Sequence, residues 1–268
     1  MDRRDAETRL ESLVRENRFT IAVVFPLVGA VTLVASELGL LPPPLAFNPV
    51  FVLFGTLVMR LPLVAGFLPL VGRREAVALV GLTAYTYLVE YVGVHTGFPY
   101  GEFEYLVSLG PMLAGVPVGL PVFFFPLVLN AYLLVLLLLR ENTPGWVRVA
   151  LAVLVVVLGD LVLDPAAVSL GFWQYADGGA YYGVPLSNYL GWILSATVAI
   201  GFVEYAFSPR ALAERLAHCE FMLDDLVSFV LLWGAVNLVY ANWVPAALAA
   251  LGVVVLVRTD RFDFRVRA

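Results

Sequence analysis

The chain has 268 residues, of which 61% are hydrophobic and 14% are charged, with a formal net charge of -5 at pH 7 and a mean hydropathy of +0.90. Soluble domains carry roughly a quarter charged residues, so this chain lacks the polar surface that a water-soluble globule needs. The net negative charge gives no reason to expect nucleic acid as a partner. The single cysteine, Cys219, excludes an intramolecular disulfide and a cysteine-rich metal site, and it is expected to be inert.

The apolar residues gather in long segments. Most of these reach the roughly 20 residues that a helix needs to cross about 30 Å of hydrocarbon, and helices satisfy their own backbone hydrogen bonds in lipid. No segment alternates as the strands of a membrane barrel do. The sequence therefore predicts an all-α, polytopic transmembrane bundle of about eight helices. They are expected at residues 19–41, 49–71, 75–94, 118–139, 147–168, 186–207, 222–241 and, as a short last segment, 243–257.

The basic residues, all 16 of them arginine, indicate the orientation of the bundle. Arginines precede the first expected helix and follow the second, fourth, sixth and eighth, whereas the other loops contain none. Basic residues are enriched in cytoplasmic loops, so this alternation predicts an even number of helices with both termini in the cytoplasm. The arginines that set the orientation are Arg3, Arg4, Arg9, Arg15, Arg18, Arg73, Arg74, Arg140, Arg148, Arg210, Arg215, Arg258, Arg261, Arg265 and Arg267.

We expect one membrane domain with short cytoplasmic ends. Residues 1–18 form a charged, amphipathic segment with a helix from about Arg3 to Asn17, which does not resemble a cleavable signal peptide. Residues 19–257 form the transmembrane catalytic domain, and residues 258–268 form a basic cytoplasmic tail. The protein is thus expected to be a multi-pass protein of the cell membrane.

Four polar residues are expected to meet in the outer half of the membrane. At about 1.5 Å per residue, Glu90 lies about 22 Å up its helix, and Asp160 reaches a similar depth. Asp164 is one turn further along the same face as Asp160, and Asn188 enters from the outer end of the next helix. Polar groups inside a bilayer are costly and point to function, so Glu90, Asp160 and Asp164 are the candidate catalytic residues.

Some of these polar residues also have a structural interpretation. Arg60, which lies deeper in the second helix, is a candidate substrate-binding residue and equally a candidate ion-pair partner for Asp160 or Asp164. Asp164 can instead cap a helix that ends before Pro165. Glu37 and Glu204 lie near helix ends and are expected to be solvated at the membrane interface. Asp224 and Asp225 begin a helix, where the helix dipole favours acids, and a structural role is expected for them.

Two long outer loops, 95–117 and 169–185, combine turn-forming residues with aromatic ones, and such loops are often functional. The first contains HTGFPYGEFEY (95–105), and the second lies within LDPAAVSLGFWQYADGGAYYGVPLSNYLGW (163–192). An interfacial aromatic belt is the alternative interpretation of these rings, and His95 is either a proton shuttle or a helix cap. The candidate substrate-binding residues here are His95, Tyr100, Glu102, Trp173, Tyr181, Tyr182, Asn188 and Trp192.

These two motifs resemble the membrane-bound carotenoid hydratase family, most of all its haloarchaeal branch, and the likeness extends over most of the chain. The resemblance implies a hydro-lyase that adds water to the terminal isopentenyl double bonds of the fifty-carbon carotenoid bisanhydrobacterioruberin, giving bacterioruberin. A bacterial-type member would instead hydrate the 1,2 bond of lycopene-like ends. The arginine-only composition agrees with a haloarchaeal source. Expected partners are the carotenoid, water, membrane lipid and other membrane enzymes of the carotenoid pathway.

Such a hydration needs acid and base groups and no redox cofactor. A proton adds to the less substituted alkene carbon, a tertiary carbocation forms, and water attacks it. The sequence contains no dinucleotide-binding glycine motif and no cluster of metal ligands, so no cofactor is expected. One of Glu90, Asp160 and Asp164 is expected to be the acid, kept neutral by its low-dielectric surroundings, and a second carboxylate accepts a proton from water.

The carbocation also needs stabilising neighbours. An aromatic face stabilises a desolvated cation by up to about 2 kcal/mol, and Asn188 is expected to hold the attacking water. The aromatic candidates are Trp173, Tyr181, Tyr182 and Trp192.

Three other functions remain open on the sequence. A carotenoid cyclase would begin with the same protonation but would add no water. An ion-coupled transporter would also place acids beside Arg60, although internal repeats and broken helices, which are common in transporters, are not clear here. A protein that only binds carotenoid would show no turnover.

Overall fold

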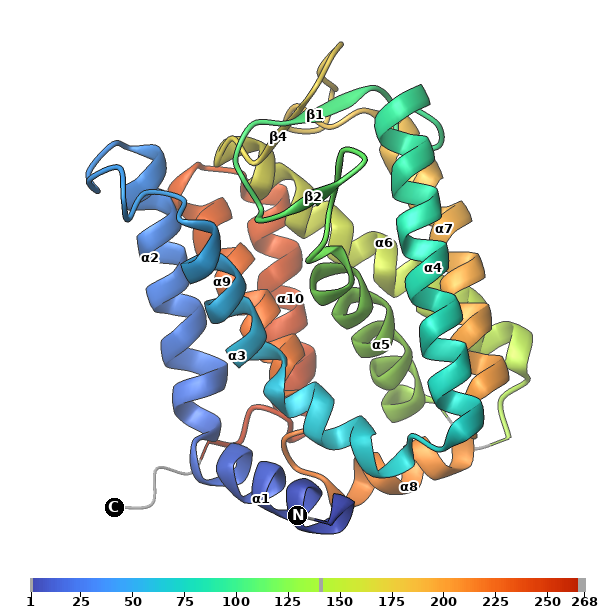
Figure 1. Ribbon diagram of the computed structural model, residues 1–268. Helices are drawn as coiled ribbons and strands as arrows, with labels where there is room; N and C mark the ends of the chain where they lie inside the picture. Colours follow the sequence, from blue (N-terminus) through green and yellow to red (C-terminus); the bar gives the residue numbers. More distant parts are fainter. Residues whose placement is uncertain (1, 140–141, 265–268) are drawn as a thin grey trace.

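The structure is a computed structural model that describes residues 2–139 and 142–264, and helices make up most of it (Figure 1). In this part of the chain, six helical spans are long and apolar enough to cross a membrane. They comprise η1 (Thr20–Val24) with α2 (Phe25–Glu37), α3 (Pro49–Phe67) with η2 (Leu68–Leu70), α4 (Arg73–Thr96), α5 (Leu120–Leu138), α6 (Gly145–Ser169) and α7 (Leu186–Ala206).

Two shorter apolar helices, α9 (Asp224–Val239) and α10 (Trp243–Arg258), lie beside these spans. Every expected segment contains one helical span, and the ends agree to within about one helical turn. The prediction of an all-α, polytopic membrane bundle is therefore confirmed.

Two amphipathic helices lie across one end of the bundle (Figure 1). The first, α1 (Arg3–Glu16), is the predicted N-terminal helix, whereas α8 (Pro209–His218) was not predicted. Helix α8 begins at a capping serine, Ser208, whose hydroxyl accepts a hydrogen bond from the Ala211 amide at 3.3 Å, and proline follows at the first helical position.

The start of α1 and the end of α10 lie at this same end, which agrees with the predicted even number of crossings (Figure 1). The assignment of this end to the cytoplasm stays a prediction. Three of the arginines on which that assignment depends, Arg140, Arg265 and Arg267, lie outside the described residues.

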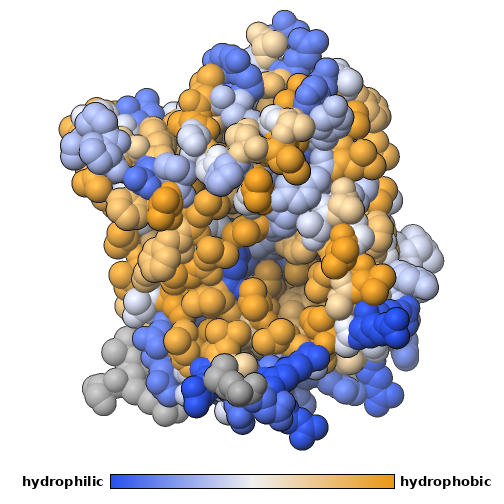
Figure 2. Space-filling model, in the orientation of Figure 1, coloured by the Kyte–Doolittle hydropathy of each residue, from blue (hydrophilic) through white to orange (hydrophobic). Residues whose placement is uncertain are grey.

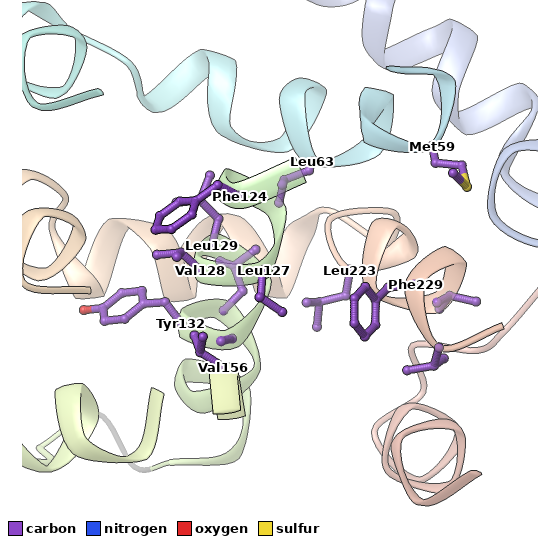
Figure 3. Close-up of a cluster of buried hydrophobic side chains, with 14 of the residues drawn as sticks. Met59, Leu63, Phe124, Leu127, Val128, Leu129, Tyr132, Val156, Leu223 and Phe229 are labelled. Carbon is purple, nitrogen blue, oxygen red and sulfur yellow. The ribbon is translucent and has the colours of Figure 1, made fainter. Parts of the chain in front are cut away.

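Helix α5 is the centre of the bundle. Its residues from Phe124 to Leu133 are buried on nearly every side, apart from Phe125, and such an all-round apolar helix belongs in a core. Figure 3 shows side chains of α5 meeting Leu63 of α3 on one side and Val156 of α6 on another. Helices pack closely where one residue is small: a Cβ atom on Gly159 of α6 would lie 2.7 Å from the Leu127 side chain of α5.

The two long loops pair with each other over one end of the bundle (Figure 1). Strand β1 (Phe103–Tyr105) pairs with strand β4 (Trp173–Tyr175) in an antiparallel register. Strands β2 (Met112–Leu113) and β3 (Val116–Pro117) form a small hairpin between β1 and α5. The β1–β4 pair thus covers the bundle end opposite to α1 and α8.

Candidate active site

Helix α6 carries two buried acids on one face. Asp160 and Asp164 are one turn apart, and their relative exposures are 0% and 3%. The interpretation that α6 ends before Pro165 is wrong, because the helix continues to Ser169. Proline leaves the carbonyl four residues earlier without its helical donor, and the hydroxyl of Tyr181 donates to that carbonyl, on Leu161, at 3.2 Å.

One amide joins the two acids of α6. The Nδ2 atom of Asn188, near the start of α7, donates to Oδ2 of Asp160 at 2.8 Å and to Oδ2 of Asp164 at 2.6 Å. The hydroxyl of Tyr175 in β4 also donates to Oδ2 of Asp164, at 2.9 Å. Among the described residues, Oδ1 of Asp160 has no hydrogen-bond partner.

The third acid comes from α4. Glu90 is half-buried, and its carboxylate accepts a hydrogen bond from the hydroxyl of Tyr105 in β1. Burial, and then the nearby Glu90 carboxylate, raise the pKa of Tyr105 well above its usual value. Burial and the Asp164 carboxylate likewise raise the pKa of Tyr175. Both tyrosines therefore stay protonated and act as hydrogen-bond donors.

The β1–β4 pairing explains how these two tyrosines reach the acids. In its register, Phe103 lies opposite Tyr175, and Tyr105 lies opposite Trp173. A short piece of each long loop therefore delivers one hydroxyl, Tyr105 to α4 and Tyr175 to α6.

A cavity of about 140 Å³ lies between these elements. Glu90, Asp164 and Asn188 face it, whereas Asp160 is buried beside them and is not part of its lining in the described chain. The other lining residues are aromatic or aliphatic: Tyr100, Phe103, Tyr105, Leu109, Pro117, Leu120, Phe123, Phe124, Leu127, Leu163, Phe172, Trp173, Tyr175, Trp192 and Trp233.

The acids carry no ion pair with a basic side chain in the described part of the chain. Four arginines with buried or half-buried side chains pair with other acids: Arg18 with Asp224, Arg60 with Asp225, Arg148 with Glu204 and Arg215 with Glu11. The half-buried Arg261 donates to the backbone carbonyls of Leu216 at 2.8 Å and Cys219 at 3.2 Å. The site is therefore an apolar, aromatic cavity with carboxyl groups on two sides.

A close approach between α7 and the first loop shapes one wall of the cavity. A Cβ atom on Gly191 would lie 2.7 Å from the Pro99 carbonyl oxygen and 2.7 Å from the Tyr100 ring. The Tyr100 ring in turn lies 5.9 Å from the Trp192 ring, and Trp192 stacks on Phe124 at 5.5 Å. Glycine at this position lets these rings close around the site.

Apart from the two acids of α6, five of the site residues predicted from the sequence lie together in the structure. Glu90, Tyr100, Trp173, Asn188 and Trp192 all line the cavity with Asp164.

Five other candidate substrate-binding residues lie elsewhere. Arg60 donates to Asp225 on α9, so it pairs with neither Asp160 nor Asp164. His95 is exposed and contacts the carbonyl of Tyr91 in its own helix at 2.8 Å. Glu102 is also exposed, and Tyr182 accepts a hydrogen bond from the backbone amide of Val244 at 3.3 Å.

The fifth of these, Tyr181, bonds the Leu161 carbonyl and packs against Tyr189 with ring centroids 5.8 Å apart. Tyr181 and Tyr182 therefore support α6 and α10 from outside the cavity lining.

Sequence reasoning missed Tyr105 and Tyr175 as site residues. Both stand inside the two aromatic motifs, so the motifs pointed to the right segments. Their contact with the acids depends on the β1–β4 register, and strands of three residues carry no periodic signal strong enough to predict.

The fold and the site define a class, a polytopic helical membrane protein with carboxyl groups facing a buried apolar cavity. The chain belongs to the carotenoid biosynthesis protein family, whose model matches residues 47–256. It is similar to the bisanhydrobacterioruberin hydratase of Haloarcula japonica, with 64% identity over 262 residues, which cover 97% of this chain and 89% of the relative. No solved structure matches the chain.

Proposed function

We propose that this protein is a carotenoid hydratase that adds water to the terminal isopentenyl double bonds of bisanhydrobacterioruberin and so forms bacterioruberin. The name of the Haloarcula japonica relative, which is 64% identical, supports the substrate and the reaction. The observation that carries the chemistry is the cavity, in which Asp164 and Glu90 face an otherwise apolar, aromatic lining.

The acid in this proposal is the Asp160–Asp164 pair. Two carboxylates that share one amide donor, with no ion pair among the described residues, cannot both ionise at acceptable cost. We assign one shared proton to the pair, and Asp164 delivers it because it faces the cavity. Both hydrogen bonds to Asp164 end on Oδ2, so Oδ1 is the atom proposed to carry the proton.

The first step moves that proton to the less substituted alkene carbon. The two π electrons form the new C–H bond, and the more substituted carbon becomes a tertiary carbocation. Trp173, Trp192 and Tyr100 present rings to the cavity, and a desolvated aromatic face stabilises a cation by up to about 2 kcal/mol.

The second step is capture of the carbocation by water. Glu90, ionised and held by the Tyr105 hydroxyl, is proposed to accept the proton that water releases as its oxygen bonds to carbon. Transfer of that proton back to the α6 pair restores the starting state, so each cycle consumes one alkene and one water. No cofactor takes part in this sequence.

We further propose that residues 19–257 form the catalytic domain and that the protein resides in the cell membrane. Membrane lipid would then surround the bundle and dissolve the substrate. Other membrane enzymes of the carotenoid pathway are proposed neighbours, because they would supply the anhydro precursor.

Expression in a host that makes the anhydro carotenoid tests the proposal. The unmodified protein should yield products heavier by one or two waters, and Asp164→Asn or Glu90→Gln should abolish them while the protein still inserts. Glu37→Gln is the matched control, since Glu37 accepts a hydrogen bond from Tyr240 at 2.7 Å and lies outside the cavity lining. An isomer of unchanged mass would indicate cyclisation, and full activity in both acid variants would refute the acid assignment.

A further inference from the structure

Helices α3 and α4 diverge from each other along one side of the bundle. They are joined near η2 and separate like the arms of a V towards the end that carries β2, with α5 behind them (Figure 1). The two arms scarcely contact each other, whereas each contacts α5. Between the arms, α5 is therefore the back wall.

The β2–β3 hairpin spans the open end of the V. On one arm, Gly119 after the hairpin lies so close to Leu53 that a Cβ atom would be 2.8 Å from it. On the other arm, the hydroxyl of Tyr87 donates to the Val118 carbonyl. Below the hairpin, Figure 2 shows a hollow in this face with mostly hydrophobic walls. We call this opening, between Leu53 and Tyr87 with Phe123 behind, the α3–α4 slot.

The slot adjoins the active-site cavity, because Phe123 belongs to both. Pro117 at the end of the hairpin, and Leu120 and Phe123 in the first turns of α5, line the cavity. All three lie within four residues of Gly119, whose Cβ position is 2.8 Å from the Leu53 side chain on the α3 wall of the slot. Leu120 and Phe123 are only half-buried.

The cavity is too small for the whole proposed substrate. A cavity needs about 10–15 Å³ to hold one water molecule. A cavity of about 140 Å³ therefore holds roughly ten non-hydrogen atoms. That is enough for one branched end of a carotenoid and far short of fifty carbons. Most of the polyene must lie outside the cavity while its end reacts.

We propose that the α3–α4 slot is a lateral passage through which one end of a long, linear, apolar polyene enters from the bilayer. The rest of the chain stays in lipid along the slot during the reaction. This inference rests on the proposed function and adds a binding surface to it. It also implies that the two ends of one carotenoid react in separate encounters, because the molecule must withdraw before its other end can enter.

Thiol labelling tests the passage without a change to the catalytic groups. The native Cys219 is 1% exposed, so a cysteine placed in the slot is the thiol that a membrane-soluble maleimide can reach. Leu53→Cys places the label in the slot, and Val254→Cys, on a 50%-exposed position of α10, is the matched control. Hydration of the anhydro carotenoid is measured for each variant before and after labelling.

The label on Leu53→Cys is expected to lower the hydration rate by about tenfold or more, which corresponds to about 1.4 kcal/mol, and the label on Val254→Cys to leave it nearly unchanged. An unchanged rate after complete labelling of Leu53→Cys would overturn the passage. The passage would also be overturned if the Leu53→Cys thiol stayed unreactive while Val254→Cys reacted, because the slot would then be closed to lipid.

A second variant, Tyr87→Cys on the opposite wall, repeats the test if Leu53→Cys does not insert. Failure of the proposed function looks different, because the unmodified and unlabelled protein would then add no water at all.

Discussion

The hydroxyl of Tyr175 in strand β4 donates a hydrogen bond of 2.9 Å to Oδ2 of Asp164 in helix α6. The contact joins the β1–β4 pair, which covers one end of the bundle, to the acid that faces the cavity. On the opposite side, Tyr105 of the paired strand donates to Glu90 of α4. One two-stranded pairing therefore fixes hydroxyl donors on both proposed participants in proton transfer.

Replacement of Tyr175 by phenylalanine removes one of these donors. Asp164 becomes a charged carboxylate as it gives up its proton, and a hydrogen bond to a charged group contributes about 1.5–3 kcal/mol. About 1.4 kcal/mol corresponds to a tenfold rate change. Tyr175→Phe is therefore expected to lower kcat by roughly tenfold to a hundredfold with little change in KM. Rates of carotenoid hydration in membranes measure both quantities.

The matched control for that experiment is Tyr240→Phe. The Tyr240 hydroxyl also bonds a carboxylate, that of Glu37, at 2.7 Å, but outside the cavity lining. Its loss should leave kcat within about twofold of the unmodified value, a difference below about 0.5 kcal/mol. Equal effects of the two substitutions would argue against a positioning role for Tyr175.

Gly191 offers a test of the cavity wall. In Gly191→Ala, the new methyl group would lie 2.7 Å from the Pro99 carbonyl oxygen, a distance that neither group can tolerate, so the Tyr100 loop must move away from α7. We expect a clear loss of hydration activity with the protein still inserted. Gly201→Ala on the same helix is the control, because no described atom outside its own turn of helix lies within 4 Å of its Cβ position. Similar activity of the two variants would contradict the packing described here.

Arg60 is expected to stabilise the bundle through Asp225. Asn130 donates to the same carboxylate at 2.5 Å, and the side chain of Asp225 is fully buried. Loss of one partner of such a pair costs about 3–5 kcal/mol, so Arg60→Met should lower the Tm of the detergent-solubilised protein strongly. A double variant, Arg60→Met with Asp225→Leu, should recover much of that loss.

The exposed pair of Arg210 and Glu214 on α8, at 2.9 Å, provides the comparison for Arg60. Exposed pairs contribute about 0–1 kcal/mol, so Arg210→Met should barely change Tm. A normal Tm for Arg60→Met, together with weaker carotenoid binding, would instead favour the substrate-binding interpretation of Arg60.

The sequence could predict heights along the helices but not the directions in which side chains point. The 3.6 residues per turn of a helix placed Asp160 and Asp164 on one face. The 1.5 Å rise per residue placed Glu90 at a similar height, to about a turn. The partner of Arg60 was not predictable in this way. Several acids lie within reach of a long side chain, and only the packing of α3 against α9 selects Asp225.

The elements that lie across the two ends of the bundle, the β1–β4 pair and α8, were the least predictable part of the structure. Residues of the 95–117 and 169–185 loops were expected to stand over the acids, and they do. The pairing of Phe103 with Tyr175 joins residues distant in sequence through strands too short to leave a pattern. Helix α8 was missed because its ten residues are amphipathic and short, unlike the long apolar runs on which the segment search depended.

The proposed shared proton on the α6 pair has a spectroscopic signature. A neutral carboxyl group absorbs in the infrared as a carbonyl, separately from a carboxylate, and the band shifts when the hydrogen is exchanged for deuterium. We expect such a band in the unmodified protein and its loss in Asp164→Asn. Glu37→Gln should retain it, since that carboxylate lies outside the site. A band that persists unchanged in Asp164→Asn would place the proton elsewhere.

The origin of the oxygen in the product tests the central claim most directly. The purified protein, reconstituted in liposomes with the anhydro carotenoid and no added cofactor, is incubated in water labelled with heavy oxygen, and the product mass is measured. The account predicts one heavy-oxygen water gained at each modified end with the unmodified protein, and none with Asp164→Asn. A product that carries no heavy oxygen, or an unchanged carotenoid with the unmodified protein, would contradict it.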